Sequence, residues 1–257
     1  MRLSWRSLLQ RKILIPLIMI FVLIITLGSL FSCQPKFLMR QIALHNPDVL
    51  FYVETDQKVL ALTIDDAPDS LLTSAILDLF SKHGICATFF IIGQKVPGNE
   101  DLITRMKAAG HELGNHMVAD EPSIMLSDEE FAANLVAVEK LIGPLGETKW
   151  CRPGSGWFTP EMVKIAHRLG YRCCLGSIYP FDNKLRHPQL IRQAVLQQIY
   201  PGAVLILHEG GPQRNYIIPL LDELIPDLLA QGYDFLTVSE LQALEKANAS
   251  GPKKKRP

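Results

Sequence analysis

The most informative part of the sequence is Val59-Leu60-Ala61-Leu62-Thr63-Ile64, which is followed directly by Asp65 and Asp66. Six consecutive residues of apolar or β-branched type predict a strand buried on both faces, as in a parallel sheet. Two carboxylates directly after such a strand stand where parallel α/β proteins place their active sites, at the carboxyl ends of the strands. If the fold is of this kind, other strands should also end in polar residues.

The alternation of strand and helix repeats about seven times between residues 58 and 245. The predicted strands are Val59–Ile64, Cys86–Ile92, His111–Leu113, Trp150–Cys151, Cys173–Leu175, Ala203–Leu207 and Phe235–Val238. Predicted helix starts are Ser70, the capping box of Ser127 and Glu130, and Thr159 before Pro160. This alternation predicts an α/β fold, either a parallel barrel or a doubly wound open sheet, and about 190 residues is short for a (β/α)8 barrel of about 250.

The formal charge of zero is an average of unlike parts. The 257 residues hold 26 Lys and Arg and 26 Asp and Glu, but four cations lie in residues 1–32 and four in the last five residues. The body between them is therefore acidic, with 18 cations against 26 anions. The hydrophobic fraction of 48% and charged fraction of 20% exclude a disordered chain, and the acidic body excludes nucleic acid as a partner bound through overall charge.

Residues 13–30 are almost continuously apolar and follow four basic residues. A stretch of this length can span the ~30 Å hydrocarbon core of a bilayer. We expect residues 1–32 to form a cytoplasmic tip and one transmembrane helix, with the body on the extracytoplasmic side. A cleaved signal peptide or a lipoprotein signal ending at Cys33 is the alternative. Residues 33–57 are interpreted as a connector, and residues 246–257 as a basic, flexible tail.

The five cysteines do not describe a disulfide scaffold, because their number is odd and their spacing follows no framework. They are Cys33, Cys86, Cys151, Cys173 and Cys174. Cys86, Cys151 and Cys173 lie in apolar, strand-like runs, so the first interpretation is that these three are small buried core residues. In an extracytoplasmic domain one pair could be oxidised, and the sequence leaves open which.

Polar residues do follow the other predicted strands. They are Asn115 and His116 after the third, with Asp120 four residues further on, Arg152 after the fourth, Asp182 beyond the fifth, and His208 with Glu209 after the sixth. Each alone has a structural interpretation, such as helix capping for Asp65 and Asp66. Together, at successive strand ends, they predict an active site. The spacing of His116 and Asp120 places them on one face if that stretch is helical, which suits a pair of metal ligands.

Four strings of the sequence carry a family resemblance. They are Leu62-Thr63-Ile64-Asp65-Asp66-Ala67-Pro68, Glu112-Leu113-Gly114-Asn115-His116, Cys151-Arg152-Pro153 and Leu205-Ile206-Leu207-His208-Glu209. In this order and spacing they resemble the NodB-homology polysaccharide deacetylases, a carbohydrate esterase family. The resemblance covers residues 58–244 and implies a deformed (β/α) barrel. It also implies hydrolysis of N-acetyl groups on chitin, chitooligosaccharides or peptidoglycan with one divalent metal ion.

The resemblance implies four catalytic positions. Asp65 resembles the general base, and Arg152 the residue that orients its carboxylate. His208 resembles the general acid, with Asp182 as the candidate for its acidic partner. Amide hydrolysis needs an activated water and a protonated leaving group, so this set supplies both proton transfers.

The same resemblance implies a metal site and a substrate side. Asp66, His116 and Asp120 would hold the metal, with zinc foremost and cobalt or manganese as alternatives. Ser155, through a backbone N–H, and Trp157 are the candidates for the oxyanion and substrate side. Asp120 replaces a His of the family pattern, so the site would be harder and more anionic.

Departures from the family pattern keep two other functions open. One is a catalytically degenerate relative that binds glycan without hydrolysing it. The other is an amidase that acts on a non-sugar amide. The expected partners are an N-acetylated glycan and the membrane, and the sequence leaves the oligomeric state open.

Overall fold

The computed structural model of the protein describes residues 34–210 and 215–250, with side chains to residue 245. From Lys36 onward the described residues belong to a single unit. Within these residues, no helix has the length and apolar character needed to cross a bilayer. The predicted transmembrane helix lies outside them, as do the last seven residues of the predicted tail.

The sheet of the described part is built from eight parallel strands. They are β1 (Val49–Leu50), β2 (Val59–Ala67), β3 (Thr88–Ile91), β4 (Glu112–Asn115), β5 (Trp150–Cys151), β6 (Arg172–Cys174), β7 (Ala203–His208) and β8 (Asp234–Leu236). Their order is β1-β6-β5-β4-β3-β2-β7, and β8 also pairs with β2. All nine residues of β2 are buried, as expected for a continuous apolar run covered on both faces.

The sheet curls into a deformed barrel around β2. One edge of β2 pairs with β7, while the other is shared by β8, at Val59–Ala61, and by β3, from Thr63 onward. A single parallel bridge between Ile178 and Leu205 also connects the segment after β6 to β7. The predicted parallel α/β fold of about seven strands is therefore confirmed in the form of a curled half-barrel, because all seven predicted strands form and curl together.

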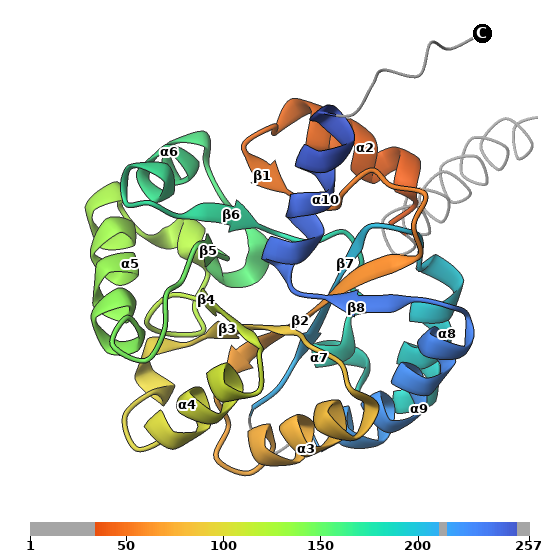
Figure 1. Ribbon diagram of the computed structural model, residues 1–257. Helices are drawn as coiled ribbons and strands as arrows, with labels where there is room; N and C mark the ends of the chain where they lie inside the picture. Colours follow the sequence, from red (N-terminus) through yellow and green to blue (C-terminus); the bar gives the residue numbers. More distant parts are fainter. Residues whose placement is uncertain (1–33, 211–214, 251–257) are drawn as a thin grey trace, which may run out of the picture. The chain divides into compact units, whose positions relative to one another are not determined.

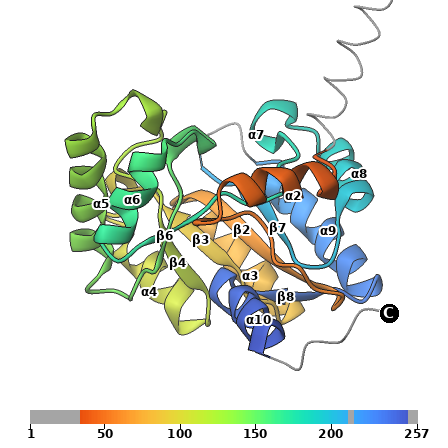
Figure 2. The ribbon, with the colours of Figure 1, turned by 90° about the horizontal axis from the view of Figure 1, so that it is seen from above.

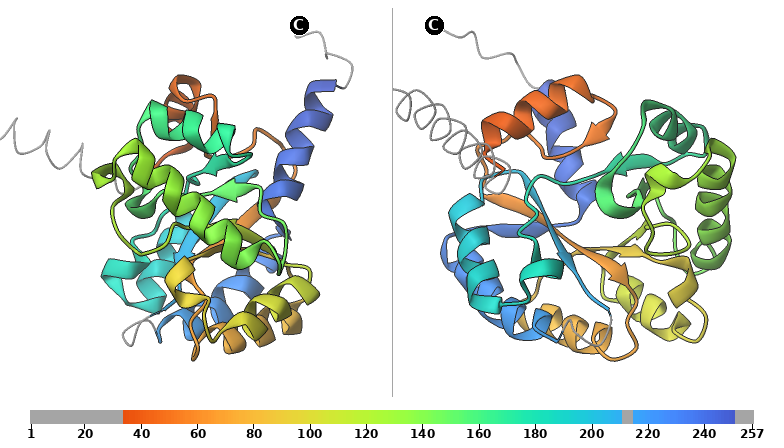
Figure 3. Two further views of the ribbon diagram at one scale, coloured as in Figure 1. Left: turned by 90° about the vertical axis from the view of Figure 1, so that its left-hand side faces the viewer. Right: turned by 180° about the vertical axis from the view of Figure 1, so that it is seen from behind.

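Helices surround the strands (Figure 1). They are α2 (Lys36–His45), α3 (Thr73–His83), α4 (Glu100–Ala108), α5 (Asp128–Ile142), α6 (Pro160–Arg168), α7 (Asp182–Leu185), α8 (Pro188–Gln198), α9 (Ile217–Ala230) and α10 (Val238–Ser250), with the 3-10 turns η1 (Gly93–Lys95), η2 (Ser123–Met125) and η3 (Gly154–Gly156). Neighbouring helices pack against one another, as α5 and α6 do along one side of the strands (Figure 3). This packing covers the outer face of the sheet.

Two of the three predicted helix starts are confirmed. Ser127 and Glu130 form the reciprocal capping box of α5, and the Thr159 hydroxyl accepts the N–H of Met162 at the start of α6. Ser70 does not cap α3. The Asp69 carboxylate accepts two nearby backbone N–H groups instead, so the chain turns there and the helix begins two residues later than predicted.

The two ends of the barrel carry different elements. The amino end is covered by the start of α10, where the Val238 N–H donates to Thr88 and the Ser239 N–H to Glu112. The short helix α7 lies at the opposite end (Figure 2). Because the amino end is filled, the carboxyl ends of the strands are left to build a site.

Two stretches hold more structure than predicted. The connector contains α2 and β1, and β1 extends the sheet by pairing with β6. A two-residue strand has no periodicity for a sequence pattern to reveal. The last helix runs to Ser250, so its backbone continues into the stretch interpreted as tail.

Candidate active site

Asp65 and Asp66 end β2 on a backbone irregularity. Consecutive strand residues point to opposite faces, so two neighbouring carboxylates would ordinarily diverge. Here the pairing register of β2 with β3 shifts between Ile64 and Ala67, and Asp66 takes a left-handed conformation with φ of 65°. As a result both carboxylates reach the same imidazole, that of His116, within 4 Å.

Arg152 is fully buried and forms an ion pair with the Asp65 carboxylate. Its guanidinium donates to one carboxylate oxygen, Asp65 Oδ1, and to the Thr63 hydroxyl at 2.9 Å. The Nε–H donates to the Cys174 carbonyl at 2.8 Å, and the guanidinium lies 3.9 Å from the centre of the Phe90 ring. A buried guanidinium held at so many points fixes the direction of the carboxylate, leaving Asp65 Oδ2 to face the imidazoles.

His208 ends β7, the strand that pairs with β2, and is the direct partner of Asp65 in the ladder. Its Nδ1 lies 2.9 Å from Asp182 Oδ1, and its Nε2 lies 3.9 Å from Asp65 Oδ2. Burial alone would lower the pKa of His208, but the charge and hydrogen bond of Asp182, with the charges of Asp65 and Asp66, outweigh it and raise the pKa to about 8. The imidazole is therefore largely protonated at neutral pH.

His116 follows β4 and turns Nε2 toward the two aspartates. Its Nδ1 lies 2.8 Å from the Arg152 carbonyl, and because a carbonyl only accepts, Nδ1 carries the proton. In the neutral imidazole Nε2 then presents a lone pair, 3.6 Å from Asp66 Oδ1 and 3.7 Å from Asp65 Oδ2. Acceptor atoms facing one another in a buried site suit a cation placed between them.

The distance between Asp66 Oδ1 and His116 Nε2 agrees with two ligands of one ion. Metal–ligand bonds of about 2.1 Å in a tetrahedral site separate neighbouring ligand atoms by about 3.4 Å. Asp66 and His116 therefore fit the predicted metal. The described residues hold no group of three His, Cys, Asp or Glu side chains arranged for a metal ion, so the third predicted ligand is not beside them.

Asp120 is exposed, in a bend rather than a helix. The chain leaves the helical path directly after His116, because Met117 is left-handed with φ of 69° and its N–H donates to the Asn115 side chain. The expected one-face arrangement of His116 and Asp120 therefore does not form. The spacing was correct for a helix, but the backbone between the two residues is not helical.

Ser155 and Trp157 lie on the exposed turn that follows β5. Ser155 is left-handed with φ of 61°, and 62% of Trp157 is exposed. They stand three and five residues beyond Arg152, outside the buried cluster. An exposed tryptophan presents an apolar ring face together with a polar N–H, which suits contact with a ligand at the surface.

Three residues without a sequence-based role also contact the cluster. The Tyr179 ring packs edge-on against His208 with centroids 5.6 Å apart. Lys95 donates to the Asp66 carbonyl at 2.6 Å. Thr63, two residues before Asp65, could have been found from strand alternation, because residues two apart share a face. Lys95 arrives from η1 and carries no local signal.

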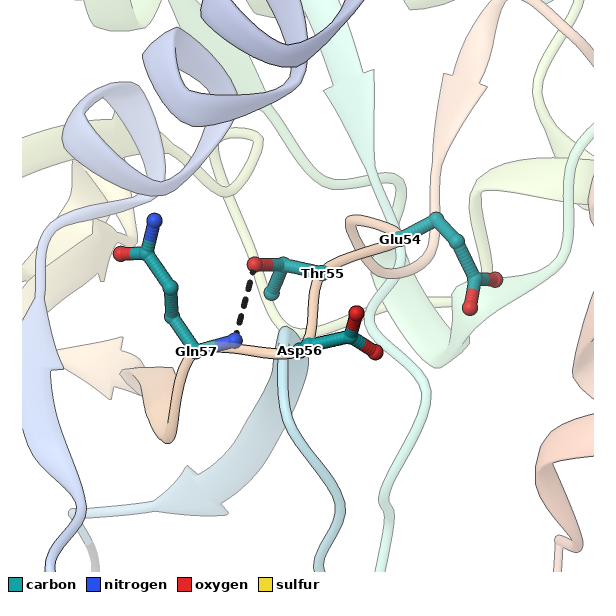
Figure 4. Close-up of a pocket in the computed structure, with 4 residues that line it drawn as sticks. All are labelled: Glu54, Thr55, Asp56 and Gln57. Atoms are coloured by element: carbon teal, nitrogen blue, oxygen red, sulfur yellow. Dashed lines mark hydrogen bonds between the residues drawn. The ribbon is translucent and has the colours of Figure 1, made fainter. Parts of the chain in front are cut away.

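A hollow lined by Glu54, Thr55, Asp56 and Gln57 lies away from this cluster. Figure 4 shows that its lining comes from one turn, held by the Gln57 N–H that donates to the Thr55 hydroxyl at 3.1 Å. That turn leads into the amino end of β2, whereas the catalytic candidates stand at its carboxyl end. We therefore assign the chemistry to the buried cluster and not to this hollow.

Known proteins resemble this chain over most of its length. The polysaccharide deacetylase family matches residues 52–174. The chain is 32% identical over 196 residues to a peptidoglycan-N-acetylglucosamine deacetylase of Bacillus cereus, covering 75% of this chain and 92% of the relative. It is 30% identical over 202 residues to the peptidoglycan-N-acetylmuramic acid deacetylase PdaA of Bacillus subtilis, covering 76% of this chain and 75% of the relative.

A solved structure adds a contrasting relative. A CE4 family pseudoenzyme from Bacillus anthracis superposes with a TM-score of 0.69 at 28% identity, covering 75% of this chain and 68% of that one. A mutant of it, described as having restored enzymatic activity, gives a TM-score of 0.70 at 30% identity, with 75% of this chain and 70% of that one covered. The same fold thus accommodates active and inactive sites.

The parallel α/β fold carries buried carboxylates and imidazoles at the carboxyl ends of its strands, where enzymes of this architecture place their active sites. Within this architecture, the chain belongs to the polysaccharide deacetylase family. The predicted family and enzyme class are confirmed, since its relatives include named peptidoglycan and chitooligosaccharide deacetylases.

Proposed function

We propose that the protein hydrolyses N-acetyl groups of an amino-sugar polymer or oligomer of the peptidoglycan or chitooligosaccharide type. The observation that carries this proposal is that a carboxylate paired with an arginine lies close to an imidazole paired with an aspartate. Asp65 Oδ2 faces His208 Nε2 at 3.9 Å, with Arg152 behind the carboxylate and Asp182 behind the imidazole. Pure glycan binding needs no such pair of opposite proton-transfer groups.

Asp65 is the proposed general base. Arg152 occupies its Oδ1, so Oδ2 is the oxygen left to take a proton from an attacking water. Because Arg152 is itself held by Thr63 and the Cys174 carbonyl, the carboxylate cannot rotate away. Such preorganisation removes part of the orientational cost of the reaction.

His208 is the proposed general acid. Its pKa of about 8 keeps a proton available at neutral pH, to be given to the sugar amine as the acetyl group departs. Asp182 fixes Nδ1–H, so the donating proton is the one on Nε2, on the side of Asp65. Ser155 and Trp157 are proposed to contact substrate at the exposed edge of the same site.

Asp66 and His116 are proposed to hold one divalent metal ion, zinc foremost, with cobalt or manganese as alternatives. Such an ion, when bound, lowers the pKa of a water and polarises the acetyl carbonyl. Asp120 would join these ligands only if the segment after Met117 moved, since in the described conformation it is exposed.

A catalytically degenerate relative is the second candidate function. Two observations favour it: the exposed position of Asp120, and the likeness to a pseudoenzyme of the same family. In that case the protein would bind an N-acetylated glycan without releasing acetate. Against it stands the complete pairing of Asp65 with Arg152 and of His208 with Asp182.

The place of action is proposed from the sequence. Residues 1–32 would anchor the protein in a membrane as a single span, with the barrel on the extracytoplasmic side, where peptidoglycan and chitin-like polymers lie. A fusion of residues 1–40 to a reporter active only outside the cytoplasm tests this orientation.

Acetate release from acetylated chitooligosaccharides and from peptidoglycan, with and without a chelator, tests the proposed reaction. We expect release that falls on chelation and is lost in the Asp65→Ala and Asp66→Ala variants. Undiminished release by both variants would overturn the residue assignments. Hydrolysis of simple acetamides in preference to glycans would favour the non-sugar amidase.

A further inference from the structure

Two buried thiols face each other on neighbouring strands. Cys151 in β5 and Cys173 in β6 are direct partners in the parallel ladder, and their Sγ atoms lie 3.6 Å apart. Both side chains are at most 1% exposed. They share a hydrophobic cluster with Met162 and Ile165 of α6, on the helix-covered face of the sheet.

The adjacent Cys174 is turned the other way. Successive strand residues point to opposite faces, and Cys174 accordingly packs with Trp150 and Val204 in a different cluster. Its Sγ lies 3.7 Å from the Arg152 guanidinium. Cys173 rather than Cys174 is therefore the thiol placed to react with Cys151.

We propose that Cys151 and Cys173 form a disulfide when the protein folds in the presence of a thiol oxidant. Neighbouring strands lie about 4.8 Å apart, within the Cα–Cα range of about 4.4–6.8 Å that a disulfide spans. Because the two residues are already direct partners in the ladder, we expect side-chain rotation to bring the sulfurs from 3.6 Å to bonding distance. The other described thiol, Cys86, hydrogen-bonds the Ala109 carbonyl at a distant strand end.

The reaction is a thiol–disulfide exchange with a low-molecular-weight disulfide such as oxidised glutathione. The thiolate of one cysteine attacks the oxidant, forming a mixed disulfide and releasing one reduced glutathione. The second thiolate then attacks the protein sulfur of that mixed disulfide, which releases the second reduced glutathione. Two thiols are thereby oxidised, one glutathione disulfide is reduced, and the two thiol protons end on the two molecules of reduced glutathione.

Burial sets when this exchange is fast. The hydrogen bond with Cys173 and burial both raise the pKa of Cys151, so little thiolate is present in the closed barrel. Exchange is therefore expected mainly during folding or local opening of the strands. Once formed, the bond is shielded from reductants by the same burial.

The disulfide would lie one residue below the candidate site. Arg152 follows Cys151, Cys174 follows Cys173, and the Arg152 Nε–H donates to the Cys174 carbonyl at 2.8 Å. A covalent link between β5 and β6 at this level would fix the separation of the two strands that carry the guanidinium and its acceptor. The inference does not depend on the reaction that the site performs.

The experiment is refolding of the full chain in a glutathione redox buffer, followed by alkylation of remaining thiols and mass mapping of unreduced peptides. We expect a Cys151–Cys173 peptide pair as the main intramolecular link. Because the bond closes a 22-residue separation, oxidised protein should melt roughly 5–10 °C higher than the same protein after reduction.

Three variants make the result decisive. Cys86→Ala should retain both the link and the shift in melting temperature, whereas Cys151→Ala and Cys173→Ala should lose both. Refolded protein with native circular dichroism and both thiols still open to alkylation after unfolding would overturn the proposal. So would a main link that uses Cys33, Cys86 or Cys174.

Discussion

The carboxylate of Asp182 holds His208 at two points. Oδ1 lies 2.9 Å from Nδ1 of the ring, and Oδ2 accepts the backbone N–H of His208 at 2.8 Å. Asp182 is fully buried and is the first residue of α7, directly after Phe181, which has a left-handed backbone conformation. Ring and backbone are thus fixed by one side chain, which sets both the direction and the charge of the imidazole.

Asp182→Asn should shift the pH dependence of acetate release. The amide removes the charge that raises the pKa of His208 to about 8, while burial, which lowers it, remains. The alkaline limb of the kcat/KM profile should therefore start near pH 8 in the wild type and at lower pH in the variant. The raised pKa of His208 also stabilises the folded protein. This stabilisation is fully present below about pH 6.5 and is lost as the pH rises through about 8. An unmoved alkaline limb would contradict the role of Asp182.

Arg152→Met should destabilise the protein by about 3–5 kcal/mol, because it leaves the Asp65 carboxylate buried without its partner. Asp65→Asn removes that unpaired charge. The double variant should therefore be more stable than the sum of the two single changes predicts. Chemical unfolding of the four proteins measures this coupling. Strict additivity would show that the pair is not energetically linked.

Glu209→Gln should flatten the dependence of stability on pH. Burial raises the pKa of Glu209 to about 8, although the Thr73 hydroxyl, which donates at 2.7 Å, opposes the shift. The carboxyl group of Glu209 binds a proton more tightly in the folded state than in the unfolded state. Its contribution to the free energy of unfolding is therefore complete below about pH 4.5 and declines as pH rises to 8. Relative to wild type, the variant should gain stability between pH 5 and pH 8. A constant difference in unfolding free energy across that range would contradict the buried, protonated state.

Titration calorimetry with zinc or manganese measures how much each proposed ligand contributes to the affinity for the metal ion. Asp66→Asn and His116→Ala should each weaken binding at least tenfold, because each removes one of two donors that lie 3.6 Å apart. Asp120→Ala should change the affinity less than about threefold, since Asp120 is exposed. Equal losses in all three variants would show that the segment after Met117 closes onto the metal.

Most of the fold was accessible from local pattern. Buried apolar runs located seven strands, and the capping residues Ser127 and Thr159 located two helix starts. The short strand β1 was missed because two residues carry no periodicity. Ser70 was a wrong prediction for the cap of α3, because the Asp69 carboxylate accepts the backbone N–H groups of that turn. Such competition between neighbouring side chains is decided by geometry that sequence does not contain.

The site was accessible in part. Polar residues at strand ends gave Asp65, His116 and His208, because parallel strands bring their carboxyl ends together. The left-handed Asp66 and Met117 were not visible in the sequence, yet the first directs a carboxylate inward and the second leads Asp120 away. Long-range contacts such as that of Lys95 with the Asp66 carbonyl follow only from the closed barrel.

Acetate release under metal-replete conditions measures whether this site transfers protons in an N-deacetylation. Wild-type protein, Asp65→Asn and His208→Ala would each be supplied in turn with zinc, cobalt and manganese, together with an N-acetylated chitooligosaccharide or peptidoglycan. We predict continuous acetate release by the wild type with at least one metal, and a loss of at least 100-fold in each variant. Saccharide binding by the wild type without acetate release under any of these metals would contradict the account and establish a glycan-binding protein.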